Sequence, residues 1–164
     1  MDFHGQYVLE YILILGFSIL VSLSSLSLVY DINELNTIMA SARSGVLLGS
    51  EMDGLAIYPP DTFNNYIEKH PRLKSGSKII FIKIIYEKDG YDPVYKKKKI
   101  KLKIYASTRS VYNADDRECM GDRINYYVRR SICKSFNTEN LTNIYYNPAF
   151  SDNYFITTYD VVWV

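Results

Sequence analysis

Two cysteines are the residues of this sequence most able to form a covalent bond. Cys119 and Cys133 are the only cysteines of the chain, and fourteen positions separate them. An even pair of cysteines in an exported chain is typical of a disulfide. Closing such a loop could contribute about 3 kcal/mol in the chain-entropy treatment. We expect a Cys119–Cys133 disulfide, with two free buried thiols as the alternative.

A cluster of lysines is the strongest local charge in the sequence. Six of eight consecutive residues are basic: Lys96, Lys97, Lys98, Lys99, Lys101 and Lys103. One interpretation is a solvated strand face that discourages edge-to-edge aggregation. The other is an adhesive patch for an anionic surface or DNA, to which nearby aromatic rings would contribute: Tyr91, Tyr95 and Tyr105.

The remaining candidate sites are weaker. Asn140-Leu141-Thr142 is the only Asn-x-Thr sequon, so Asn140 is a candidate for glycosylation if the chain is exported. The acidic run 115–118 lacks the spacing of a known calcium loop and is more typical of a helix start. Neither His4 nor His70 has zinc-ligand spacing. We expect no enzymatic activity, no metal and no cofactor.

Composition narrows the class of protein. The chain has 164 residues, enough for one ordinary domain, and 48% of them are hydrophobic. This apolar content, together with 16 tyrosines, argues against disorder. A formal net charge of only +1 argues against a dedicated nucleic-acid binder, which normally has a strongly basic domain. We therefore expect a folded protein with no specific nucleic-acid partner.

The segment from Tyr7 to Tyr30 is apolar on every side of a helix and carries a single charge, Glu10. Its 24 residues would span about 36 Å as a helix, against roughly 30 Å for the hydrocarbon core of a bilayer. A secretory signal is the alternative, since Ser25-Leu26-Ser27 could form a cleavage site. However, Met1–Gly5 lacks the usual basic residues. The segment predicts a membrane helix and argues strongly against a soluble cytosolic enzyme.

Glu10 is the unusual residue of this apolar segment. A carboxylate at the centre of a bilayer costs about 2.5–3.5 kcal/mol on insertion scales, and less near the interface. Either Glu10 lies at the interface, or it has a cationic partner. No nearby side chain supplies that cation, but a newly formed α-amino group could.

The residues Gly5-Gln6-Tyr7-Val8-Leu9-Glu10, followed by a long apolar helix, resemble the processing site of type IV pilins, particularly archaeal pilins with a class III signal peptide. The resemblance implies that a prepilin peptidase cuts between Gly5 and Gln6, which makes Glu10 the fifth mature residue. In the archaeal pattern Gln-x-Ser-x-Glu, Gln6 and Glu10 match, whereas Val8 replaces the serine. Archaeal flagellins generally lack this glutamate, so Glu10 favours a pilin.

The resemblance also implies a function and a set of partners. The chain would be the structural subunit of an extracellular, type IV pilus-like filament at the cell surface, a helical homo-oligomer that serves adhesion. Its precursor would be inserted in the membrane and would meet the prepilin peptidase, the assembly ATPase and the platform protein. Glu10 would pair with the terminal amine of an adjacent subunit. The alternatives are a minor pilin or adhesin with a ligand-binding head, and an uncleaved membrane-anchored surface domain.

The elements that position these residues follow from periodicity. Beyond Tyr30, apolar residues recur at spacings of three and four, including Ile38, Ala42 and Val46, which predicts one continuous helix whose second half packs against a head domain. Prolines 59 and 60 end this helix. We therefore expect a cleaved leader over 1–5, a stalk helix over 6–56 and a β-rich head over 57–164.

The head is expected to be an antiparallel sheet with short helices, giving an α+β, lollipop-shaped pilin-like fold. Two strands are predicted at 78–87 and 94–106, joined by a hairpin turn at Asp89-Gly90, with the first strand central in the sheet. Short helices are expected over 61–69 and within 116–135, and a last strand over 154–164. In the second strand, lysines alternate with Ile100, Leu102 and Ile104, which predicts one solvent-exposed and one buried face.

Overall fold

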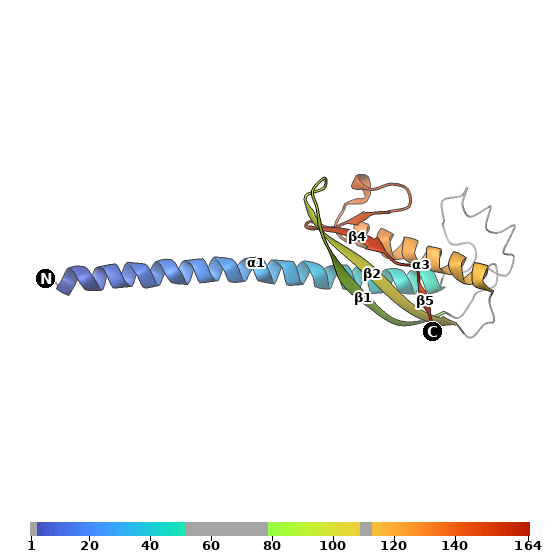
Figure 1. The fold of residues 1–164 in the computed structure, drawn as a ribbon, viewed down its shortest axis with the longest axis horizontal. Coiled ribbons are helices and arrows are strands. Elements are labelled where there is room, and N and C mark those ends of the chain that lie inside the picture. The colour runs from blue at the N-terminus through green and yellow to red at the C-terminus, as the bar shows by residue number, and fades with distance from the viewer. Residues whose placement is uncertain (1–2, 52–78, 109–112) are drawn as a thin grey trace. The chain divides into compact units, whose positions relative to one another are not determined.

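The structure is a computed structural model that describes residues 3–51, 79–108 and 113–164. The predicted helix over 61–69 and the prolines expected to end the stalk lie outside these residues. The predicted α+β class is confirmed (Figure 1). The elements, in chain order, are α1 (Phe3–Glu51), β1 (Ile79–Asp92), β2 (Lys97–Thr108), α3 (Ala114–Ser135), the short 3-10 helix η2 (Glu139–Leu141), β3 (Ala149–Phe150), β4 (Tyr154–Thr158) and β5 (Val162–Trp163).

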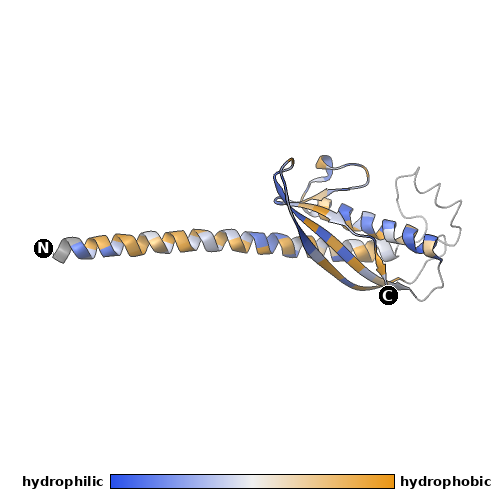
Figure 2. Ribbon diagram, in the orientation of Figure 1, coloured by the Kyte–Doolittle hydropathy of each residue, from blue (hydrophilic) through white to orange (hydrophobic). Residues whose placement is uncertain are grey.

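The chain divides into two compact units, Met1–Asn36 and Thr37–Val164. The described part of the first unit is entirely helix α1, and every residue from Gln6 to Tyr30 is exposed. Figure 2 shows that this helix is predominantly apolar along its first part. The span Gln6–Ser50 is long and apolar enough to cross a membrane. An apolar helix of this kind indicates membrane insertion or secretion.

The second unit begins within α1, whose last turns pack against α3. The side chains of Ile38, Ala42 and Val46 are fully buried, as the helical periodicity predicted. The two backbones approach closely, because a Cβ built on Gly45 would lie only 2.5 Å from the Cα of Val128. Only glycine fits at this crossing. The predicted packing of the stalk's second half against the head is therefore confirmed.

The sheet has five strands in the order β1-β2-β4-β3, with β5 also paired to β2. The β1–β2 and β3–β4 pairs are antiparallel, as predicted. The expectation of a wholly antiparallel sheet is wrong, because β4 and β5 both run parallel to β2. The first strand is not central either: β2 occupies the centre, and β1 is an edge strand with Ile80 and Ile82 exposed.

The turn between β1 and β2 lies four residues beyond the predicted Asp89-Gly90. It comprises residues 93–96, and the Asp92 Oδ1 atom accepts hydrogen bonds from the backbone N–H groups of Val94 (2.9 Å) and Tyr95 (3.0 Å). An aspartate followed by a proline is a strong start for such a turn. Gly90 instead has φ +86° within β1, where the register shifts between Lys88 and Tyr91. Asp89-Gly90 therefore forms a β-bulge.

Helix α3 covers the predicted helical region and begins slightly earlier. Asn113 caps it, because its side chain accepts a hydrogen bond from the backbone N–H of Asp116 at 2.7 Å. Ile124, Val128 and Ile132 of this helix are fully buried, and so are Leu102 and Ile104 of β2. The single strand predicted over 154–164 is two strands, β4 and β5, separated by Tyr159-Asp160-Val161.

Candidate functional sites on the helix and the sheet

The residues of the pilin-like motif lie in the first turns of α1. Glu10 is exposed, and its Oε1 atom accepts a hydrogen bond from Gln6 Nε2 at 3.3 Å, one helical turn away. Aliphatic neighbours surround this pair, and both Leu9 and Ile12 are more than 60% exposed. In a single chain the carboxylate thus faces outward from an apolar helix.

Four serines within the apolar part of α1 are paired within the helix. The hydroxyl groups of Ser18, Ser22, Ser24 and Ser25 each donate to the backbone carbonyl four residues earlier, at 2.8–2.9 Å. A hydroxyl that is paired in this way loses much less free energy on transfer from water to an apolar environment. This segment can therefore be buried in lipid or among other helices despite its serines.

The predicted lysine–apolar alternation of β2 is confirmed. Ile100, Leu102 and Ile104 are buried, whereas Lys101 and Lys103 are partly exposed on the opposite face of the strand. These lysines lie over aromatic rings. Lys101 Nζ lies 3.9 Å from the ring centroid of Tyr159, and Lys103 Nζ lies 5.8 Å from the same centroid. Such cation–π contacts hold the ammonium groups in place on the surface.

Two further residues from β1 complete this face. Lys83 Nζ lies 4.6 Å from the ring of Tyr105, and Glu87 accepts a hydrogen bond from the Tyr159 hydroxyl at 3.0 Å. That hydrogen bond raises the pKa of Tyr159 above its usual value. We call this surface the lysine–tyrosine face: Lys83, Glu87, Lys101, Lys103, Tyr105 and Tyr159. Sequence reasoning missed Lys83, Glu87 and Tyr159, because only the strand pairing brings them beside β2.

The other predicted lysines make different contacts from Lys101 and Lys103. Lys97 Nζ donates to the backbone carbonyls of Ser151 (2.7 Å) and Asp152 (2.6 Å), which ties β2 to the loop before β4. Lys98 lies over the Tyr154 ring, and Lys99 forms an ion pair with Asp89 at 3.6 Å. Lys96 is exposed in the β1–β2 turn with φ +53°. The six lysines thus have different environments: Lys99, Lys101 and Lys103 share one face of β2, and Lys96 lies in the turn.

The predicted disulfide is wrong. Cys119 and Cys133 are both free and buried, and both lie on helix α3. Fourteen residues of helix separate their Cα atoms by about 21 Å, far beyond the 4.4–6.8 Å that a disulfide requires. Burial raises the pKa of Cys119 to about 12 and also raises the pKa of Cys133. The alternative of two free buried thiols is the one that the structure supports.

Asn140 lies in the 3-10 helix η2 and is exposed. An oligosaccharide transferase needs an accessible acceptor side chain, and Asn140 meets this requirement. Its glycosylation stays a prediction.

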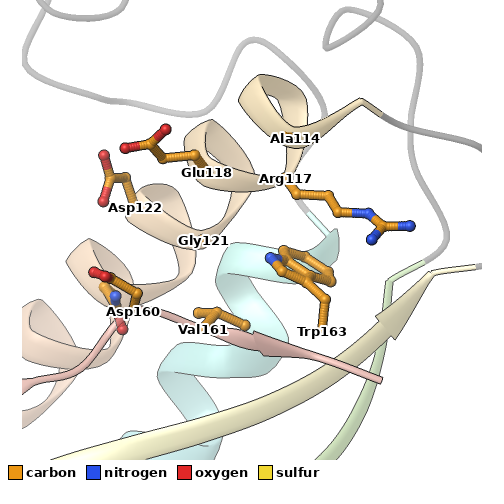
Figure 3. A pocket seen from close by; sticks show the side chains of 9 residues that line it. Ala114, Arg117, Glu118, Gly121, Asp122, Asp160, Val161 and Trp163 are labelled. Carbon is orange, nitrogen blue, oxygen red and sulfur yellow. The ribbon is translucent and has the colours of Figure 1, made fainter.

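The head also contains a pocket that was not predicted (Figure 3). It has a volume of about 310 Å³ and lies between the N-terminal half of α3 and the segment 160–163. Glu118 and Asp122 of α3 and Asp160 give it an acidic side, and Trp163 forms an aromatic wall. Asn125 also lines the pocket and is only 4% exposed. These five residues come from two segments, α3 and 160–163, that are far apart in sequence, so no local motif could have revealed the pocket.

Comparison with family models, with curated proteins and with solved structures finds no match to this chain. The functional interpretation therefore depends on the helix, the head and the geometry of these sites.

Proposed function

We propose that this chain is the subunit of an extracellular filament of the type IV pilin kind. In this proposal, a prepilin peptidase cuts between Gly5 and Gln6, and the N-terminal helices of many copies then bundle to form the filament core. The observation that carries the proposal is the first part of α1: from Tyr7 to Tyr30 the helix is exposed and apolar, with one carboxylate, Glu10, near its start. The precursor would be inserted in the membrane until an assembly ATPase and a platform protein extract it.

Burial of the apolar helix surface would drive assembly. Apolar side chains from Tyr7 to Tyr30 are about half exposed or more in the single chain. Packing them against neighbouring helices removes them from lipid or water, while the hydroxyls of Ser18, Ser22, Ser24 and Ser25 keep their backbone partners. Because aliphatic packing is not directional, it does not by itself determine how far one subunit is displaced along the next.

Glu10 would supply that register. Cleavage before Gln6 creates an α-amino group with a reference pKa of about 7.7–8, which is largely protonated at neutral pH. An ammonium and a carboxylate that meet in an apolar core attract strongly, and either of them left unpaired there is costly. Only one axial displacement brings the amine of one subunit to Glu10 of the next. The pair would therefore select one arrangement of the helices.

The test is peptide mapping of the N-terminus in protein sheared from the surface of the native cells. We expect the first residue to be Gln6, in material that electron microscopy shows to be filamentous. A chain that begins at Met1 and stays in the membrane fraction would contradict the proposal and favour an uncleaved anchored domain. A chain that begins near Leu28 would instead indicate a secreted protein.

A second candidate function is that of a minor pilin or adhesin, and the lysine–tyrosine face is the observation that favours it. Ammonium groups held beside tyrosine rings form a surface that can bind anionic polymers by charge and by stacking. This candidate predicts low copy number in filaments. It also predicts that K101E and K103E together abolish retention on anionic polysaccharide, whereas K88E on the same sheet does not.

A further inference from the structure

The pocket beside α3 contains a buried acceptor that lacks a donor. The Asn125 side chain donates through Nδ2 to the carbonyl of Tyr159 at 3.0 Å, which fixes the orientation of its amide. Its Oδ1 atom has no hydrogen-bond partner among the residues that the structure describes. A buried unpaired carbonyl is costly, and a donor entering the pocket would remove that cost. The pocket therefore favours a ligand that donates hydrogen bonds.

The charge around the pocket indicates that this donor is a cation. Glu118 and Asp160 are exposed at its rim, and Asp122 lines it as well; among the described residues that line the pocket, Arg117 is the one basic residue. Within the described ranges, no group of three or more His, Cys, Asp or Glu residues is close enough to hold a metal ion. Trp163 adds an apolar wall. A primary ammonium on an aliphatic stem, such as a lysine side chain, matches these features.

A lysine of this kind is presented at the other end of the same sheet. Lys96 is exposed in the turn of residues 93–96, next to Val94, which is 81% exposed. The turn is firmly held: the Asp92 side chain accepts two of its backbone N–H groups, and the Tyr95 ring lies 4.9 Å from that of Phe150. Lys96 thus differs from Lys97, whose ammonium group is bound within its own chain.

The turn and the pocket cannot meet within one chain. Trp163 pairs with Ala106, nine residues along β2 from Lys97, and nine residues of strand span about 30 Å. Figure 1 likewise shows the β1–β2 turn and the first turns of α3 at opposite ends of the sheet. A complementary pair at opposite ends gives a heterologous contact, which builds an open filament when the rotation between successive subunits does not close a ring.

We propose that the turn of one subunit docks into the pocket of the next, with Lys96 beside Glu118, Asp160 and the Asn125 carbonyl, and Val94 toward Trp163. This inference rests on the proposed filament function and adds to it a contact between heads. The helices would supply most of the assembly energy, and this contact would determine the angle at which successive heads follow one another.

Zero-length cross-linking of wild-type filaments tests the contact directly. A carbodiimide joins an amine to a carboxylate only when the two touch, and mass spectrometry then identifies the pair. We expect links from Lys96 to Glu118 or Asp160, and the separation of about 30 Å means that such links join two subunits. Filaments that cross-link at other residues but never through Lys96 would overturn the inference.

Charge reversal gives a second test. K96E should reduce the yield of sheared filaments about tenfold, as expected for loss of a charged hydrogen bond. The same loss is expected for the double variant E118K/D160K. Combining all three substitutions should restore much of the yield. The matched controls, K88E and E139K, change exposed charges elsewhere and should have no effect. Loss in the controls as well, or no rescue, would overturn the inference.

The two proposals fail in different ways. If the surface protein begins at Met1 and forms no filament, the proposed pilin function and the proposed head contact are both wrong. If the chain begins at Gln6 in filaments that lack the Lys96 link and tolerate K96E, the function stands and only the head contact is wrong.

Discussion

The two compact units of this chain share helix α1, but they differ in whether the apolar side chains of that helix are buried. From Gln6 to Tyr30, within the first unit, the apolar side chains of α1 are exposed around the whole helix. After Thr37, the same helix buries a single stripe that includes Ile38, Ala42 and Val46, within a head that has its own core. The first unit thus needs an apolar environment supplied from outside, whereas the second supplies its own.

The two parts of α1 are therefore stabilised differently: the part after Thr37 by contacts with α3, and the part before Tyr30 by hydrogen bonds within the helix. The second unit depends on close backbone contact, since Gly45 and Gly49 let α1 approach α3. Arg123 of α3 adds a hydrogen bond from Nε to the Gly49 carbonyl at 2.9 Å. The first unit makes hydrogen bonds only within the helix in its described residues up to Tyr30, such as those of its serines. Equivalent substitutions in the two units should therefore have different consequences.

The largest expected effect separates two glycines of α1. Gly45→Val would place side-chain atoms on the Val128 backbone, where even a Cβ lies 2.5 Å from Cα. We expect it to reduce the free energy of unfolding by about 3 kcal/mol or to prevent folding of the head. Gly16→Val is the matched control, because nothing lies within 4 Å of its added Cβ. Protease protection and thermal unfolding in detergent would measure both; equal losses would remove the distinction between the two units.

The next effect concerns assembly and not stability. Glu10→Gln keeps the shape of the side chain and its ability to accept from Gln6, but removes the charge. If Glu10 pairs with a terminal amine, the yield of filaments should fall on the order of tenfold or more, as for loss of a charged hydrogen bond. The unfolding temperature of the detergent-solubilised subunit should not change. Filament counts by electron microscopy and a thermal scan would decide; full assembly of the variant would exclude a charge-dependent register.

A smaller effect is expected from the two buried thiols of the second unit. In the folded protein, burial raises the pKa of Cys119 to about 12, whereas a model thiol titrates near 9. Below pH 9, both the folded and unfolded states hold the proton, so the contribution to stability is constant. Between pH 9 and 12 the unfolded thiol ionises first, and the folded state loses stability as the pH rises.

This behaviour can be measured with a thiol reagent and with two variants. At pH 8 we expect the folded protein to react at neither cysteine, and urea to expose two thiols. Cys119→Ala should flatten the decline in stability above pH 9, whereas Ile144→Ala, at a site that is 67% exposed, should leave it unchanged. Detection of a cross-link between Cys119 and Cys133 would contradict the helix α3 that separates them.

Much of the architecture could be predicted from local patterns. The apolar run predicts the membrane-type helix, spacings of three and four predict the buried stripe at Ile38 and Ala42, and strict alternation predicts the two faces of β2. Each of these signals lies in consecutive residues. The hairpin turn was misplaced because Asp89-Gly90 suits a turn and a bulge equally well, and Asp92-Pro93 competed with it.

What local patterns could not supply is the pairing of distant segments. Strands β4 and β5 align parallel to β2 although some fifty residues separate them, so β2 became central and β1 an edge. The disulfide prediction failed because helix α3 begins at Ala114 and includes Cys119 as well as Cys133. The pocket and the lysine–tyrosine face have the same origin: both join residues that only the tertiary fold brings together.

The smallest expected effect lies on the exposed face of the second unit. The Tyr159 hydroxyl donates to Glu87, so deprotonating the phenol would break this hydrogen bond and bring two negative charges together. The pKa of Tyr159 is therefore raised, and the fold should lose a little stability as the pH rises above 10. Glu87→Gln removes the negative partner and should return the titration midpoint toward 10, whereas Glu139→Gln, on η2, should not move it. Carbon-13 NMR of the tyrosine ring measures the midpoint directly. If Glu87→Gln leaves the midpoint unchanged, the Tyr159–Glu87 hydrogen bond does not determine it, and the contact assigned between β1 and Tyr159 on this face is wrong.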